Sequence, residues 1–191
     1  MRYQPGHKAQ VHRKILKDAS RRVRAEGITG AAVSSVMRDV GLTHGGFYKH
    51  FGSKDDLLTE SLSAAFQETA DRLTQAAGKS PPGEAWKAVV KAYLSAEHCE
   101  HAERGCPLAA LAPELARADH SIKVPTRGEL IKYKNRMLPL MPGRRVADKE
   151  QAFFAIFSTM IGAIAIARIL PDQAARARVL ASARDFLLRS F

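Results

Sequence analysis

The segment Arg38–Leu58, which reads RDVGLTHGGFYKHFGSKDDLL, carries the pattern that decides the fold. Gly41 predicts the end of a short helix, because glycine adopts left-handed backbone angles without steric cost. Thr43 and Ser53 are residue types that cap helices through their hydroxyl groups, so each predicts the start of a further helix. Two short helices joined by a tight, glycine-containing turn are typical of the helix-turn-helix motif, whose second helix enters the DNA major groove.

The predicted second helix, residues 44–50, supplies most of the candidate DNA contacts. Phosphate oxygens suit Thr43 with its backbone N–H at the helix start, the phenol of Tyr48 and the ammonium of Lys54. His44 and Lys49 are the candidate readers of base edges. The complete set of predicted DNA-binding residues is Thr29, Thr43, His44, Gly45, Gly46, Phe47, Tyr48, Lys49, His50 and Lys54.

Three residues of this set have a role that depends on size or shape. Gly45 and Gly46 have no side chains, so the recognition helix can lie close to the DNA backbone. Phe47 has two interpretations: it contacts a thymine methyl group, or it packs in the core, as Phe51 is expected to do. The sequence leaves both open for Phe47.

Residues Phe47–Leu57 closely resemble the Y-x-H-F-x-S-K-x-x-L signature of the tetracycline-repressor (TetR) family. The similarity extends back through Ile15, Leu16, Ala19 and Gly27 and covers about the first 60 residues. Ala31 and Ala32 depart from the family pattern, which commonly has threonines there that cap a helix and contact phosphate. Thr29 is the nearest replacement.

The resemblance implies a helix-turn-helix DNA-binding domain over residues 9–69, with its motif at about 32–51, and an effector-binding and dimerisation domain over residues 70–191. It also implies a ligand-responsive repressor that acts as a homodimer on a palindromic operator in double-stranded DNA. The effector is an unidentified small molecule, and no cofactor is expected.

The charge distribution independently favours a nucleic-acid partner. The chain of 191 residues has a formal net charge of +11, and residues 1–24 contain eight lysines and arginines against Asp18 alone. Such a basic segment beside the helix-turn-helix is the expected footprint of phosphate binding. A membrane surface is a poorer match, because this segment lacks a bulky apolar face. The polar N-terminus and the two cysteines predict a cytoplasmic protein without structural disulfides.

Helical periodicity with no strand pattern predicts an all-α fold of about nine helices. The expected ranges are 8–26, 32–40, 44–50, 54–77, 84–101, 108–118, 125–141, 146–170 and 173–190, after a flexible arm over residues 1–7. Residues 146–170 are apolar almost all round, which requires burial on several sides. The mostly apolar run of 16 residues from Ala152 to Ala167 is too short to span a bilayer.

A helix of this kind favours dimerisation, because one chain of this size can hardly cover all its faces. Small residues within it would let a partner helix approach closely. The predicted dimer contacts are Phe153, Phe157, Met160, Ile161, Gly162, Ile164 and Ala165.

A group of histidines and cysteines over residues 98–106 has three interpretations. His98, Cys99, His101 and Cys106 are structural, or a thiol senses oxidants or electrophiles, or the group binds zinc or copper. Cys106 precedes Pro107 at a predicted helix start, where the helix dipole favours thiolate. The spacing matches no standard metal-ligand pattern, so no metal site is predicted.

Large apolar residues elsewhere either line an effector cavity or form an ordinary core. The candidate effector or sensor residues are Phe66, Trp86, Tyr93, Cys99, Cys106, Met137 and Phe157, with Tyr133 and Met160 beside them. The sequence leaves two other functions as alternatives: a nucleoid-type protein that binds DNA without sequence preference, and an α-helical enzyme. No nucleophile–base pair, phosphate loop or metal motif supports an enzyme.

Overall fold

The fold is described from a computed structural model, which covers residues 6–30, 32–81 and 83–191. The described residues are helical and contain no strand, as the sequence predicts. The α-helices are α1 (His7–Glu26), α2 (Val33–Asp39), α3 (Lys54–Ala77), α4 (Ala85–Tyr93), α5 (Ala96–Glu100), α6 (Pro107–Arg117), α7 (His120–Met137), α8 (Val146–Ile169) and α9 (Gln173–Ser190). The 3-10 helices are η1 (His44–Lys49), η2 (Ala102–Arg104) and η3 (Leu138–Leu140). Most of the predicted arm and Ala31 lie outside the described residues.

Glycines end the first helices where the sequence predicts. Gly27 follows α1 with φ of +83°, and Gly41 lies between α2 and η1 with φ of +78°. A Cβ atom on Gly27 would also lie 2.9 Å from Oε1 of Glu114, so a side chain is excluded there by both strain and space. Ser53 caps α3 as predicted, since its side-chain oxygen accepts the N–H of Asp56 at 3.1 Å.

Three local predictions were wrong. The predicted recognition helix is a 3-10 helix, in which the backbone N–H of Gly46 donates to the carbonyl of Thr43 at 3.0 Å, and the Thr43 side chain makes no cap hydrogen bond. The helix expected over residues 84–101 is broken, because Ser95 takes an extended conformation and caps α5 by accepting the N–H of His98. Finally, α7 begins at His120 and not at Pro125. Pro125 removes only one hydrogen bond there, and the early start buries Ile122.

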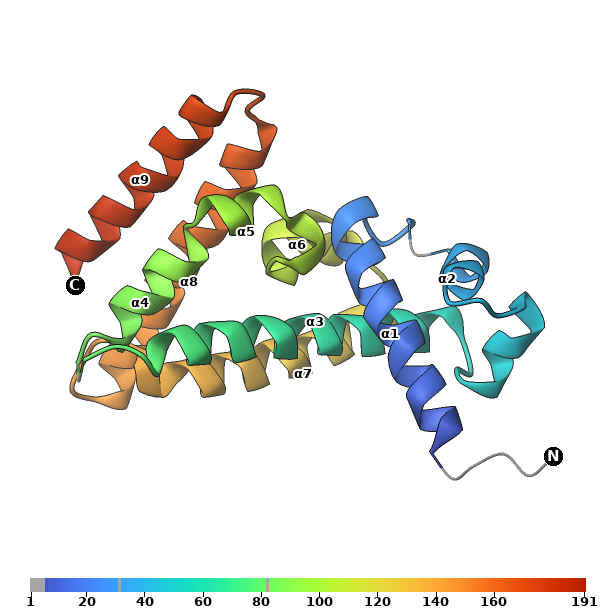
Figure 1. The fold of residues 1–191 in the computed structure, drawn as a ribbon. Helices are drawn as coiled ribbons and strands as arrows, with labels where there is room; N and C mark the ends of the chain where they lie inside the picture. The colour runs from blue at the N-terminus through green and yellow to red at the C-terminus, as the bar shows by residue number, and fades with distance from the viewer. Residues whose placement is uncertain (1–5, 31, 82) are drawn as a thin grey trace.

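The long helix α3 runs through the whole molecule and joins its two ends (Figure 1). The helix α7 lies along α3, while α1 crosses it near its first turns. The pair α8 and α9 lies at the end of the molecule opposite α2 and η1. Both ends are therefore attached to one rigid element.

Three apolar clusters hold these elements together. The first unites α1, α2, η1 and the start of α3 around Ile15, Met37, Phe47 and Phe51. The second joins α1 and α3 to α6 and α7, and consists of Val23, Leu58, Leu62, Leu111, Leu115 and Ile122. The third and largest fills the space between α3, α4, α7, α8 and α9. The second cluster lies between the other two and joins the end that carries α2 and η1 to the rest.

Helix α8 is long and apolar enough to cross a membrane by length and composition, with a mean hydropathy of 2.0. Its inward residues account for part of this composition, because Phe153, Ile156, Phe157, Met160 and Ile164 are buried in the third cluster. The prediction of a buried core helix is therefore consistent with the packing of one face.

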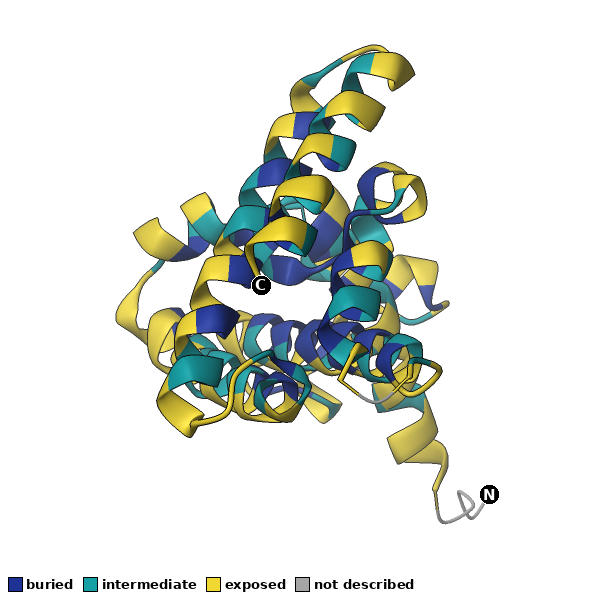
Figure 2. Cartoon of the chain, turned by 90° about the vertical axis from the view of Figure 1, so that its left-hand side faces the viewer, coloured by how far each residue is buried: buried dark blue, intermediate teal, exposed yellow. Residues whose placement is uncertain are grey.

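The predicted dimer contacts lie on two different faces of α8. Phe153, Phe157, Met160 and Ile164 are 0–3 % exposed within a single chain, so they are core residues and not a surface for a partner. Ile161, Gly162 and Ala165 are half-buried. The outward face of α8, which we call the α8 outer face, consists of Phe154, Ala155, Ser158, Gly162, Ala165, Ile166 and Ile169. Figure 2 shows exposed positions recurring along the helices at this end of the molecule.

We expect Phe47→Ala to destabilise the chain by about 3–5 kcal/mol, because it leaves a cavity in the first cluster. Tyr48→Ala is the matched control: Tyr48 is the next residue and is 69 % exposed, whereas Phe47 is 2 % exposed. Chemical denaturation followed by circular dichroism measures both. Equal destabilisation by the two variants would contradict the packing described for Phe47.

Candidate nucleic-acid interface

The exposed surface of η1 carries the polar groups suited to DNA. Tyr48 is 69 % exposed, and the side chains of His44 and Lys49 are also exposed. The Tyr48 ring is held edge-on to the buried ring of Phe47, with their centroids 5.2 Å apart. This contact fixes the direction of the phenol, which stands clear of the protein and is able to donate to a phosphate.

A concave surface of about 840 Å³ lies between the start of α1 and η1. It is lined by Gly6, His7, Lys8, Val11, Leu42, Thr43, Gly46, Tyr48, Lys49 and His50. Five of the predicted DNA-binding residues thus share one hollow with the basic beginning of α1. Lys8 was not among the predicted contacts, although the cluster of cations in residues 1–24 gave a signal for it.

Two predicted contacts are placed less favourably. Phe47 is buried in the first cluster, 5.5 Å from the Phe51 ring between centroids, so core packing is its role and a thymine contact is not available to it. His50 is half-buried. Burial, with the nearby charges of His12, Lys8 and Lys49, lowers the pKa of His50. At neutral pH it is therefore an uncharged part of the wall of the hollow.

The remaining candidates lie at helix boundaries. Thr43 is exposed at the start of η1, Lys54 is exposed in the first turn of α3, and Thr29 is exposed in the turn after α1. Arg38 also reaches solvent from the last turn of α2, with its side chain 77 % exposed. Arg38 was missed, because a single arginine at the end of a short helix gives no distinctive pattern.

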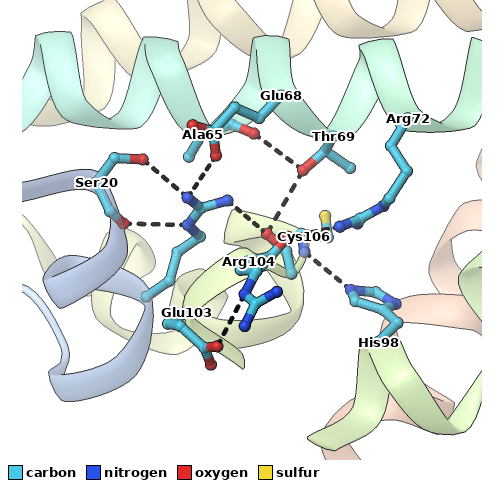
Figure 3. A network of polar contacts seen from close by, with 11 residues as sticks. Ser20, Ala65, Glu68, Thr69, Arg72, His98, Glu103, Arg104 and Cys106 are labelled. Carbon is cyan, nitrogen blue, oxygen red and sulfur yellow. Dashed lines mark hydrogen bonds and ion pairs between the residues drawn. The ribbon is translucent and has the colours of Figure 1, made fainter. Parts of the chain in front are cut away.

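A buried arginine anchors α1 to the rest of the chain. Arg24 has a side chain that is 0 % exposed, and its guanidinium donates to Glu68 Oε2 at 2.6 Å. It also donates to the carbonyl of Gly105 at 3.1 Å and to both the carbonyl and the hydroxyl of Ser20. Figure 3 shows this network, in which three segments far apart in sequence converge. A buried charge is tolerated only when it is paired and hydrogen-bonded in this way.

A second contact holds the end of α1. The carboxylate of Glu114 on α6 accepts the backbone N–H of Ile28 at 2.8 Å. The close approach requires the glycine at position 27, as described above. Together, Arg24 and Glu114 fix the C-terminal end of α1 against the α5–α6 region, and so fix the direction in which the DNA-binding end faces.

The histidine and cysteine group is buried beside this anchor. His98 Nε2 accepts the backbone N–H of Cys106 at 2.9 Å, and Nδ1 lies 2.6 Å from the carbonyl of Tyr93 and donates to it. Burial lowers the pKa of His98 to about 4, so the ring is neutral. Both ring nitrogens of the neutral His98 then have a hydrogen-bond partner, so the ring can be buried in the core.

The cysteines are placed as structural residues. Cys106 is 0 % exposed, Cys99 is 4 % exposed, and burial raises the pKa of the Cys99 thiol. Neither thiol offers an oxidant an open approach. Among the described residues, no group of three or more His, Cys, Asp or Glu side chains is arranged to hold a metal ion. This geometry supports the interpretation that His98, Cys99 and Cys106 have a structural role.

The predicted effector residues come together in the third cluster. Phe66, Trp86, Tyr93, Cys99, Cys106, Met137 and Phe157 are all buried there. The rings of Tyr133 and Phe157 meet edge-on at 5.5 Å, and those of Tyr93 and Phe157 at 6.0 Å. These residues therefore pack against one another, which supports the interpretation that they form an ordinary core.

A model of one protein family matches the DNA-binding end of the chain. The family is described as bacterial regulatory proteins, tetR family, and the match covers residues 15–60. Those residues include the second half of α1, the helix-turn-helix and the first turns of α3. Among curated proteins, no sequence matches the chain.

Solved structures with the same fold extend over nearly the whole chain. A TetR transcriptional regulator from Chloroflexus aurantiacus is 20 % identical, with a TM-score of 0.77 over 95 % of this chain and 94 % of that one. The reduced form of NemR from E. coli is 16 % identical, with a TM-score of 0.74 over 94 % and 96 % of the two chains. A TetR-family transcriptional regulator from Streptomyces coelicolor is 22 % identical, with a TM-score of 0.70 over 97 % and 91 %.

The solved structures establish the fold, and the match over residues 15–60 establishes the type of DNA-binding segment. Both agree with the exposed recognition helix and with the basic surface beside it. The segment over residues 15–60 thus matches the tetR-family model, and the whole chain has the fold of the TetR-family regulators named above.

Proposed function

We propose that the chain is a ligand-responsive repressor, which binds a palindromic operator as a homodimer in the cytoplasm. The observation that carries this proposal is the exposed polar surface of η1 beside the basic start of α1, at the far end of α3 from α8 and α9. In this proposal residues 9–69 form the DNA-binding domain, and residues 70–191 form the effector-binding and dimerisation domain.

Each polar group has a distinct role in the proposed complex. Tyr48, Lys54 and Thr43 bind phosphates and set the position of η1, whereas His44 and Lys49 read base edges. Lys8 adds a further cation on the other wall of the hollow. No step of this mechanism requires catalysis, which agrees with the regulatory function of the family.

The α8 outer face supports a homodimer. Phe154 is 53 % exposed, Ile166 is 55 % exposed and Ile169 is 80 % exposed, although all three lie on one helix. Phe186 on α9 is a further exposed apolar side chain, at 58 %. An apolar stripe along one helix, with small residues at Ala155, Gly162 and Ala165, suits the close packing of a second copy. Two such chains would present two recognition surfaces to the two halves of a palindrome.

Control by a ligand follows from how α1 is held. The orientation of α1 depends on contacts from the α5–α6 region through Arg24 and Glu114. A ligand that displaces this region would therefore rotate the DNA-binding end and change the distance between the two η1 helices of the dimer. The ligand needs only to bind one of the two arrangements more tightly.

A nucleoid-type function remains the second candidate, because the charge of +11 alone would attract any DNA. The two functions differ in sequence preference. A nucleoid-type protein would bind all duplexes alike and would have no use for exposed base-reading groups such as His44 and Lys49.

We expect Lys54→Ala and Tyr48→Phe to weaken binding to operator and to random DNA by similar factors, about 5–10-fold each. Each substitution removes a phosphate contact, which contributes affinity without reading sequence, and Lys54→Ala reduces the salt slope by about 1. Titrations at several salt concentrations measure this. Lys79→Ala, an exposed lysine after α3, is the charge-matched control. Loss of operator discrimination with unchanged random-DNA affinity would overturn these roles.

We expect Gly162→Arg to convert the dimer to a folded monomer. A Cβ atom on Gly162 meets nothing within 4 Å in a single chain, so the chain itself tolerates the larger residue. In the dimer, the same arginine would place a charge in a close helix contact, at a cost of several kcal/mol. Light scattering and circular dichroism measure mass and fold.

Gln75→Arg adds the same residue to an exposed position of α3 and is the control for Gly162→Arg. It is expected to leave the mass unchanged. If the Gly162→Arg protein keeps the mass of a dimer, the α8 outer face is not the interface.

A further inference from the structure

A polar pocket of about 390 Å³ opens between α3, α4 and η2, on the side of the turn that anchors α1. It is lined by Arg72, Ala92, Ser95, Glu97, His98, His101 and Arg104. Its volume is in the range of small-molecule sites. It is separate from the packed third cluster, where the effector residues were expected.

The pocket has cationic groups with unused donors. Arg104 contacts Glu103 through Nε at 3.3 Å, and its two terminal nitrogens have no partner among the described residues. Arg72 donates through Nη1 to the carbonyl of Arg104 at 2.6 Å, while Nη2 is buried without a hydrogen-bond partner. A buried donor without a partner is unfavourable, so an added acceptor in reach of Arg72 would be favourable.

The chain itself already places a carboxylate at the rim. Glu103 Oε1 lies 3.3 Å from Nε of Arg104 and 3.3 Å from Nδ1 of His101. Glu97 also lines the pocket, so a ligand has to bind beside two acids as well as the two arginines. A single carboxylate suits this balance better than a multiply charged anion does. Planar carboxylates are also matched by the forked geometry of a guanidinium.

The wall of the pocket and the anchor of α1 belong to the same turn. The carbonyl of Arg104 accepts from Arg72, the carbonyl of Gly105 accepts from Arg24, and the N–H of Cys106 donates to His98. Figure 3 shows Arg72, Arg104, Cys106 and His98 gathered around this turn, with Ser20 and Glu68 on the other side. The turn packs closely against its neighbours and needs glycine at position 105, since a Cβ atom there would lie 2.8 Å from Arg168 Nη2 and 2.9 Å from His98 Nε2.

The geometry points to this pocket as the site of a small organic carboxylate that regulates DNA binding. The carboxylate is held by Arg104 and Arg72, and its body lies against Ala92 and the imidazole rings. Binding draws both arginines toward the ligand, moves the turn at residues 104–106 and loosens the contact of Gly105 with Arg24. This inference rests on the proposed ligand-responsive function and names its ligand class and route.

Benzoate is a suitable probe, with benzamide as its neutral isostere and inorganic phosphate as a different anion. Calorimetric titration of the full chain without DNA tests binding alone. We expect benzoate to bind at least 10-fold more tightly than benzamide or phosphate. Arg104→Gln is expected to weaken benzoate at least 10-fold, and so is Ala92→Phe, which fills the pocket without changing a charge. Arg144→Gln, an exposed arginine before α8, is the control and is expected to bind as the wild type does.

The second part of the experiment measures operator affinity with and without saturating benzoate. We expect benzoate to release DNA from the wild type and from Arg144→Gln, but not from Arg104→Gln, with each protein compared with its own operator affinity without benzoate. The pocket assignment is overturned if benzoate does not bind, if Arg104→Gln binds it equally well, or if phosphate or benzamide binds as tightly. Any of these results, with operator binding intact, leaves the DNA-binding function standing. Failure of the wild type to prefer an operator would instead overturn the proposed function itself.

Discussion

The buried guanidinium of Arg24 is the constraint on which the arrangement of the molecule depends. It lies on α1 but is neutralised by Glu68 of α3 and bonded to Gly105 in the turn before α6. Its side chain is fully buried, so these partners cannot be exchanged for water without a large cost in free energy. The first helix therefore cannot change its direction while the turn at residues 104–106 stays in place. The orientation of the DNA-binding surface is therefore set by the guanidinium of Arg24, which needs Glu68 and the carbonyl of Gly105 as its buried partners.

This arrangement gives the unusual polarity of the α5–α6 region a structural reason. His98 is neutral in the core because burial lowers its pKa, and its two nitrogens bond to Tyr93 and Cys106. Arg168 donates to the carbonyls of His98 and Cys99. Burial lowers the pKa of Arg168. The short helices α5 and η2 have few backbone hydrogen bonds of their own, and side chains such as Arg168 and Arg72 bind their carbonyls instead. A segment of this kind can move as a unit when a ligand changes those side-chain contacts.

Much of the fold could be predicted from local sequence, because local rules dominate at the places concerned. Gly27, Gly41 and Ser53 set helix boundaries through backbone freedom and capping, and the ranges of α3 and α9 agree with the prediction to the residue. The exposed polar surface of η1 was also predictable, because polar residues in a short helix after a glycine turn form a dense pattern. The 3-10 geometry of η1 and the break at Ser95 could not be predicted. Both depend on which acceptor a backbone N–H bonds to in the folded chain: the carbonyl of Thr43 for Gly46, and the hydroxyl of Ser95 for His98.

The sequence could not distinguish the two faces of α8 or locate the polar anchor. A helix that is apolar all round has no period to show which side faces inward, so core residues such as Phe153 and Met160 were placed with surface residues such as Gly162. The contact between Arg24 and Gly105 joins residues 81 positions apart, and nothing local to either predicts it. The polar pocket beside this contact escaped notice for the same reason, because Arg72 and Arg104 meet only in the folded chain.

The central claim is that this surface reads DNA sequence as two related halves. Selection of bound duplexes from a random library by the full chain, followed by footprinting of the selected sequence, tests it directly. The account predicts convergence on an inverted repeat whose half-sites are about one helical turn or more apart, both protected together. Selection of no preferred sequence, with continuous protection of any duplex, would contradict the account and leave a DNA-binding protein without an operator.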